Sequence, residues 1–160
     1  AAQKTKKDAL QQRLAYQEIG RERARNSSDL HLLGCMLYWG EGAKGRNHLQ
    51  FVNTDPYMMK LFIRFLREEF ELEDKDFYLN VMHHTTDESE IERIEHYWRD
   101  WLNLSSDCAV NMQLKKGTKS RKARYENGIC SLGVNNTEIL QHIFGAIQEY
   151  IGFDNPDWVK

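Results

Sequence analysis

The segment from Leu30 to Gly40 constrains the fold most, because its residues are apolar nearly all round. A helix of this kind is expected to be buried, since it has no polar face to present to water. The Ser-Ser-Asp stretch at 27–29 favours a helix N-cap, and the Gly-Glu-Gly stretch at 40–42 favours its end. We therefore expect the chain to pack around this helix, with small residues at 34–35 admitting a close neighbour.

Hydrophobic periodicity predicts an α+β chain, and a length of 160 residues suits one core. Helices are expected over 3–26, 30–40, from Thr54 as N-cap, 88–102 and 137–151, and strands over 48–53, 77–82, 108–114 and 129–134. The first 28 residues are polar with a thin apolar stripe, so we interpret 1–28 as a helical arm and 29–160 as the domain proper.

Composition limits the compartment and the cofactors. No apolar run approaches the roughly 20 residues that span a bilayer, and no apolar signal segment opens the sequence. Three cysteines, none in a CxxC pair, are typical of buried, reduced thiols, so we expect a cytoplasmic protein with no membrane partner. The adjacent His83 and His84 would point to opposite sides of a strand, which argues against a shared zinc ion.

Charge is unevenly distributed although the net charge is only −2. Residues 1–28 hold seven Lys or Arg against three Asp or Glu, and residues 113–126 hold six against one. Residues 29–112 hold eight against sixteen. Basic stretches on an acidic body can form a phosphate-binding face, but the 115–124 run taken alone favours a solvated loop.

The nine residues Gly34-Cys-Met-Leu-Tyr-Trp-Gly-Glu-Gly42 resemble the LAGLIDADG motif, in which a buried helix ends in an acidic residue followed by glycine. The segments Leu49–Pro56 and Ile129–Ile147 are similar to elements that follow this helix in the family, so the resemblance covers about residues 29–152. The chain is closer to bacterial proteins carrying a Tyr-Trp-(small)-Glu-Gly motif than to the homing endonucleases proper.

The resemblance implies a mixed sheet covered on one face by helices, with the motif helix at a homodimer axis, because a single-motif chain must pair with a copy of itself. Gly34, Leu37 and Tyr38 would then line the dimer interface. Glu41 would be a catalytic residue and bind Mg²⁺ near the scissile phosphates. Lys44 would stabilise developing negative charge, although its place in the turn favours an ordinary turn lysine. The motif begins Gly-Cys-Met rather than Leu-Ala-Gly, and its acid is Glu rather than Asp.

Each expected strand alternates between an apolar side and a polar side. Amides suit adenine edges in the major groove and lysine suits guanine, but any sheet face exposed to water is also polar. The candidate DNA-binding residues are His48, Gln50, Tyr78, Asn80, Asn111 and Gln113 on the strands, with Lys115, Lys116, Lys119, Arg121, Lys122 and Arg124 in the basic run.

The expected function is sequence-specific binding of double-stranded DNA by a homodimer, with Mg²⁺-dependent phosphodiester cleavage left open. A non-catalytic regulator on the same fold is one alternative, which the divergent motif favours. A protein-interaction module without DNA is another, because the stretches 68–76 and 87–95 are strongly acidic.

Overall fold

The computed structural model describes residues 2–116 and 125–160. Within these ranges the chain forms five α-helices and one four-stranded mixed sheet, which confirms the α+β class. Two compact units share the chain: a helical unit, which contains the residues up to Leu49 together with Asn135–Lys160, and a sheet unit, Gln50–Val134. No helix in the described ranges has the length and apolar character needed to cross a membrane.

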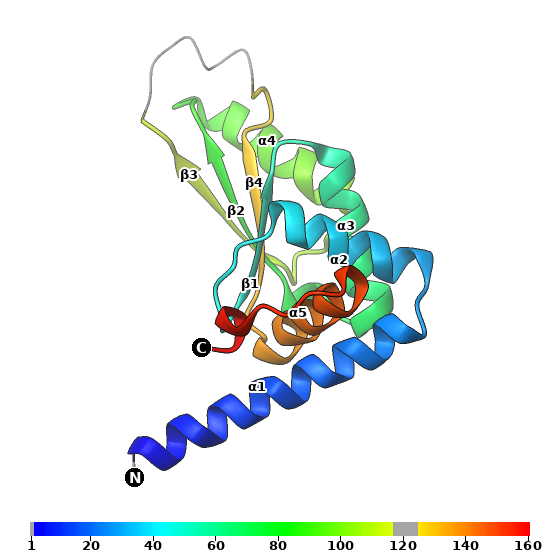
Figure 1. Ribbon diagram of the computed structural model, residues 1–160. Coiled ribbons are helices and arrows are strands. Elements are labelled where there is room, and N and C mark those ends of the chain that lie inside the picture. Colours follow the sequence, from blue (N-terminus) through cyan, green and yellow to red (C-terminus); the bar gives the residue numbers. More distant parts are fainter. Residues whose placement is uncertain (1, 117–124) are drawn as a thin grey trace. The chain divides into compact units, whose positions relative to one another are not determined.

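The helical unit is built from α1 (Ala2–Arg25), α2 (Asp29–Glu41), α5 (Thr137–Ile151) and a short 3-10 helix, η3 (Pro156–Val159). The first helix lies along α5 (Figure 1). The stretch that the sequence sets apart as an arm therefore belongs to the same compact unit as the C-terminal helix.

Glycine and glutamine residues determine how α1 lies on α5. A Cβ atom at Gly20 would lie 1.9 Å from the carbonyl oxygen of His142, so the two backbones touch at this point. Beside the contact, the side chain of Gln17 is buried. Its amide nitrogen donates to the side-chain oxygen of Gln141 at 2.8 Å, and its oxygen accepts from the side-chain amide of Gln148 at 3.0 Å. Buried amides must be hydrogen-bonded, and these bonds satisfy them across the helix pair.

The second helix begins at its predicted cap, where the Ser28 hydroxyl accepts from the backbone N–H of His31 at 3.2 Å. The His31 ring is fully buried and contacts α5 through the Tyr150 hydroxyl at 2.6 Å and His142 Nε2 at 3.0 Å. This polar contact fixes which side of α2 faces inward.

One side of α2 is exposed, which corrects the expectation that the helix is buried all round. Leu32 is 38%, Leu33 49% and Trp39 44% exposed, whereas Cys35 and Tyr38 are fully buried. An apolar helix therefore presents large side chains to the surface, a feature that usually marks an interaction site.

The sheet unit holds β1 (Leu49–Asn53, apart from its first residue), α3 (Pro56–Phe70), the 3-10 helix η1 (Asp74–Asp76), β2 (Tyr78–His83), α4 (Glu88–Trp101), β3 (Ala109–Leu114) and β4 (Ile129–Val134). Spatially the strands run β1-β4-β2-β3, with β2 parallel to β3 and antiparallel to β4. Asp55, not the expected Thr54, caps α3, because its carboxylate accepts from the backbone N–H of Tyr57 at 2.9 Å.

One face of this sheet packs against α3 and α4. Leu79 and Val81 of β2 and Leu132 of β4 are buried on that side. Phe51 of β1 stacks on Phe62 of α3 with ring centroids 4.2 Å apart. The opposite side chains along the strands form the open face, which carries the candidate site.

Candidate nucleic-acid interface

The open face consists of the alternate side chains that point away from α3 and α4. Strand register aligns them in rows, because Tyr78 lies opposite Ala109 and Gly133, Asn80 opposite Asn111 and Ser131, and Met82 opposite Gln113 and Ile129. Asn111 and Gln113, on the edge strand β3, are exposed, and Asn80 is half-buried. The predicted alternation of β1, β2 and β3 is therefore correct, except that Leu114 is 48% exposed.

A row of four polar side chains crosses all four strands of this face, and we call it the polar row. Its members, in spatial order, are Gln50, Ser131, Asn80 and Asn111. The Gln50 amide donates to the Ser131 hydroxyl at 3.1 Å, and the Asn111 amide donates to the Asn80 side-chain oxygen at 3.1 Å. Ser131 is only 4% exposed, so its hydroxyl holds the Gln50 amide, and a ligand would meet the three amides already held in place.

Tyr78 lies across the next row, and Gly133 makes room for it. A Cβ atom at Gly133 would lie 2.0 Å from Cζ of the Tyr78 ring. The glycine is thus required by the aromatic ring on the neighbouring strand, and the ring covers the backbone of β4.

The open face is electrically neutral, with positive charge at one end. None of the four strands contains Asp, Glu, Lys or Arg. Lys115 and Lys116 follow β3 and are exposed, and the backbone N–H of Lys115 donates to the His83 carbonyl at 2.7 Å. The other predicted phosphate contacts, Lys119, Arg121, Lys122 and Arg124, lie outside the described residues.

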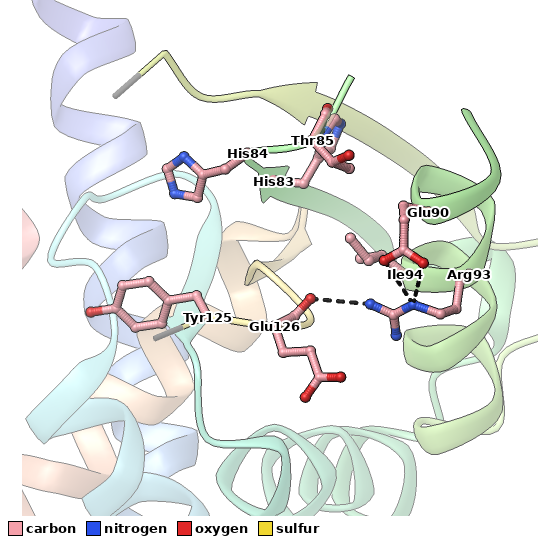
Figure 2. Close-up of a pocket in the computed structure, with 8 residues that line it drawn as sticks. All are labelled: His83, His84, Thr85, Glu90, Arg93, Ile94, Tyr125 and Glu126. Atoms are coloured by element: carbon pink, nitrogen blue, oxygen red, sulfur yellow. Dashed lines mark hydrogen bonds and ion pairs between the residues drawn. The ribbon is translucent and has the colours of Figure 1, made fainter. Parts of the chain in front are cut away.

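A cavity of about 400 Å³ opens at the end of β2, beside Lys115. Figure 2 shows the His84 and Tyr125 rings on one side of it and the Glu90–Arg93 pair on the other. Nδ1 of His84 contacts the Lys115 carbonyl at 3.1 Å. A carbonyl only accepts, so Nδ1 is the donor in this contact.

The cavity wall opposite β2 is held by two side chains of α4. Arg93 donates to the Asn127 side-chain oxygen at 2.9 Å and to the Glu126 carbonyl at 3.2 Å. Trp98 donates its indole N–H to the Asn127 carbonyl at 2.7 Å. Both oxygens of Glu90 accept from Nε of Arg93, at 3.3 and 3.1 Å, so this pair holds the wall of the cavity in place.

Glu41 and Lys44, the two predicted catalytic residues, lie at the end of α2 in the helical unit. Glu41 is exposed. The Lys44 ammonium donates to the backbone carbonyls of Tyr38, at 3.0 Å, and Gly42, and lies 5.5 Å from the Tyr38 ring centroid. Burial lowers the pKa of Lys44, and the charge of Glu41 opposes that shift. Lys44 therefore caps the carbonyl end of α2, where a cation is favourable.

A metal cage built by the protein alone needs several ligand side chains close together. The part of the chain that the structure describes has no group of three or more His, Cys, Asp or Glu side chains that could hold a metal ion. Glu41 is a single exposed carboxylate, and Mg²⁺ bound by one carboxylate takes its other ligands from water and phosphate oxygens.

The structure brings together some of the predicted residues and separates others. Gln50, Tyr78, Asn80, Asn111 and Gln113 share the open face, and His48 is exposed just before β1. Gly34 and Tyr38 are buried, and the Tyr38 hydroxyl donates to the Ala43 carbonyl at 2.6 Å.

Sequence reasoning missed two residues of the interface, Ser131 and Gly133. Their signal was available, because they occupy alternate positions of the otherwise apolar strand 129–134 and so define its second side.

No protein-family model, curated protein or solved structure matches this chain. Function is therefore inferred from the surfaces of the molecule alone.

Proposed function

We propose that the chain binds double-stranded DNA in a sequence-specific manner through the open face of the sheet. The polar row carries this proposal, because it places the amides of Gln50, Asn80 and Asn111 on a surface that has no charged strand residue, with the buried Ser131 hydroxyl holding Gln50. The major groove is the surface of DNA that presents a distinct donor and acceptor pattern for each base pair.

The hydrogen bonds within the polar row favour recognition of adenine. Asn111 uses an N–H to bind the Asn80 oxygen, which leaves N–H donors on Asn80 next to the side-chain oxygen of Asn111. A neighbouring donor and acceptor match N7 and the N6 amino group of adenine.

The distribution of charge also favours DNA binding through the open face. The acidic stretches belong largely to α4 and to the end of α3 and the turn after it, in the layer that packs on the other face. Lys115 and Lys116 lie at the end of the open face, where they would contact phosphates. Phosphate contacts position a protein on DNA, whereas base contacts give specificity.

We further propose that α2 pairs with α2 of a second copy. Leu33 is 49% exposed and Leu37 is half-buried, and they lie one turn apart on the exposed side of the helix. Association would therefore use Leu33 and Leu37 rather than Gly34 and Tyr38, which are buried. Burial of this stripe would remove an apolar surface from water.

Glu41 lies one further turn along the same stripe, after Leu33 and Leu37. Pairing through this stripe would bring two Glu41 carboxylates toward each other. DNA cleavage with Mg²⁺ is for this reason the second candidate function, and it needs ligands from both copies.

Selection of bound duplexes from a random pool tests the proposal, followed by incubation of the selected duplex with Mg²⁺. We expect enrichment of adenine-containing sites. If cleavage occurs, Glu41→Gln should abolish it while affinity holds or rises, because the lost carboxylate no longer repels phosphates. A pool that shows no enrichment would contradict sequence-specific binding, and intact cleavage by the variant would exclude Glu41 as a metal ligand.

A further inference from the structure

The helix layer of the sheet unit contains a groove of about 460 Å³ between α3 and the end of α4, which we call the α3–α4 groove. The buried side chains Ile63 and Leu102 contribute to its lining, together with half-buried Leu61 and Trp101. This apolar lining would bury a bulky side chain of a ligand.

Two aromatic rings stand at the groove in a fixed arrangement. Trp101 donates its indole N–H to the Pro56 carbonyl at 2.7 Å, which anchors the ring to the first turn of α3. Tyr57 contacts Trp101 edge to face, with ring centroids 5.1 Å apart, yet it is 72% exposed. An exposed aromatic ring held by a second ring is a low-entropy contact surface for a partner.

A stripe of cations borders the same groove. Lys60, Arg64 and Arg67 follow one another along a single side of α3 and all line the groove. Arg67 is engaged with Asp74 at 2.8 Å, and Arg64 with Glu68 at 3.2 Å. The Lys60 ammonium lies 4.2 Å from the Trp101 ring centroid, and no ion pair to it occurs in the described residues.

This concentration of positive charge is unusual for the sheet unit. Residues 50–116 and 125–134 contain eight Lys or Arg against fifteen Asp or Glu, and three of the eight cations line the groove. Asp100 is the one acidic residue in the lining. Glu68, Glu69 and Glu71 follow directly at the end of α3. An extended polyanion would meet these carboxylates, whereas a short ligand with one or two negative charges would meet Lys60 and Arg64 alone.

We propose that the α3–α4 groove binds a short acidic peptide segment of a partner protein, with an aromatic or aliphatic side chain against Tyr57 and Trp101 and a carboxylate beside Lys60 and Arg64. Charge complementarity and the apolar lining select this occupant together. The groove belongs to the helix layer, not to the open face, so the proposal is independent of DNA binding.

The test titrates isotope-labelled full chain with a capped peptide, acetyl-Asp-Phe-Glu-Leu-amide, at up to millimolar concentrations. The readout is the indole N–H signal of Trp101 in a proton–nitrogen correlation spectrum, assigned by its loss in Trp101→Phe. The indole signals of Trp39 and Trp158, which do not line the groove, serve as internal references. A second peptide replaces both acids by amides, and a short oligothymidylate represents single-stranded nucleic acid.

We expect the acidic peptide to move the Trp101 signal and the amide peptide to move it much less. Lys60→Gln should lower the affinity for the acidic peptide by about two- to fivefold. Lys75→Gln, which removes one exposed lysine of the same unit outside the groove, should leave binding unchanged. Equal shifts with both peptides, or no shift with either, would overturn the proposal. A larger response to oligothymidylate would also overturn it and assign the groove to nucleic acid.

Discussion

Substitution of Gly20 by alanine tests how firmly α1 belongs to the helical unit. The added Cβ would lie 1.9 Å from the His142 carbonyl oxygen, whereas Cβ atoms practically never approach other heavy atoms within 3.0 Å. Since a packed interior leaves no spare room, α1 must move away from α5 by about 1 Å. The oxygen is a backbone atom and the position of the Cβ is fixed by its own backbone, so a side-chain rotation cannot relieve the clash.

The cost follows from the hydrogen bonds beside the contact. The side chains of Gln17, Gln141 and Gln148 are all buried. Hydrogen bonds between their amide groups join Gln17 to Gln141 at 2.8 Å and to Gln148 at 3.0 Å. Separating the helices by about 1 Å breaks these bonds, and each buried amide left unsatisfied costs about 1–3 kcal/mol. Alanine has a higher helix propensity than glycine, which raises the free energy of unfolding by about 0.5–1 kcal/mol and offsets part of this cost. We therefore expect Gly20→Ala to lower the free energy of unfolding by about 2–4 kcal/mol.

Urea denaturation followed by circular dichroism measures this change, and Gly40→Ala is the matched control. Gly40 is also in a helix, but a Cβ there meets nothing within 4 Å. The control should be neutral or more stable by up to about 1 kcal/mol. If Gly20→Ala is as stable as the wild type, α1 does not pack on α5 through Gly20.

Three further predictions concern individual side chains. Lys44→Met should cost about 1–2 kcal/mol of stability, because it removes the bonds to the end of α2; a loss of DNA affinity with unchanged stability would instead make Lys44 a phosphate contact. The backbone N–H of Ser105 and then Arg67 hold the pKa of Asp74 below its usual value. This stabilisation is present above the unfolded pKa and lost as pH falls through the folded one, so Asp74→Asn should lower stability at neutral pH by about 1–2 kcal/mol and flatten the acid limb of a stability–pH profile below about pH 4. Burial raises the pKa of the Cys108 thiol to about 11, so a disulfide reagent at pH near 8 should modify it only in denaturant; rapid reaction in the folded protein would refute its burial.

Most elements were predictable because their sequence signals are local. The strand 129–134 and the helix 137–151 occur where periodicity places them, and Asn136 caps that helix with its side-chain oxygen. The cap of α3 was predicted at Thr54 although Pro56 occupies the first helical turn. Proline is favoured at the first helical position, and the residue before that position is the N-cap. The position of Pro56 therefore predicts Asp55 as the cap.

The polar row was not predictable, because it depends on strand order. Gln50 and Asn80 are separated in space by β4, which is the last strand in the sequence. Alternation assigns each side chain to a face but does not say which strands are neighbours. Periodicity also does not separate Trp101 from the buried Ile94 and Trp98 of the same helix, although Trp101 is half-buried at the end of α4 and lines the α3–α4 groove.

The most direct test of the open face is the affinity of duplex DNA for two variants that each add one negative charge. Asn111→Asp places a carboxylate in the polar row, whereas Asn103→Asp places one after α4, on the helix side of the sheet unit. Fluorescence anisotropy with the selected duplex at low salt measures both against the wild type. DNA binding through the open face predicts that Asn111→Asp weakens binding by about tenfold or more while Asn103→Asp has little effect. Equal affinities for Asn111→Asp and the wild type, or no binding by any of the three proteins, would contradict it.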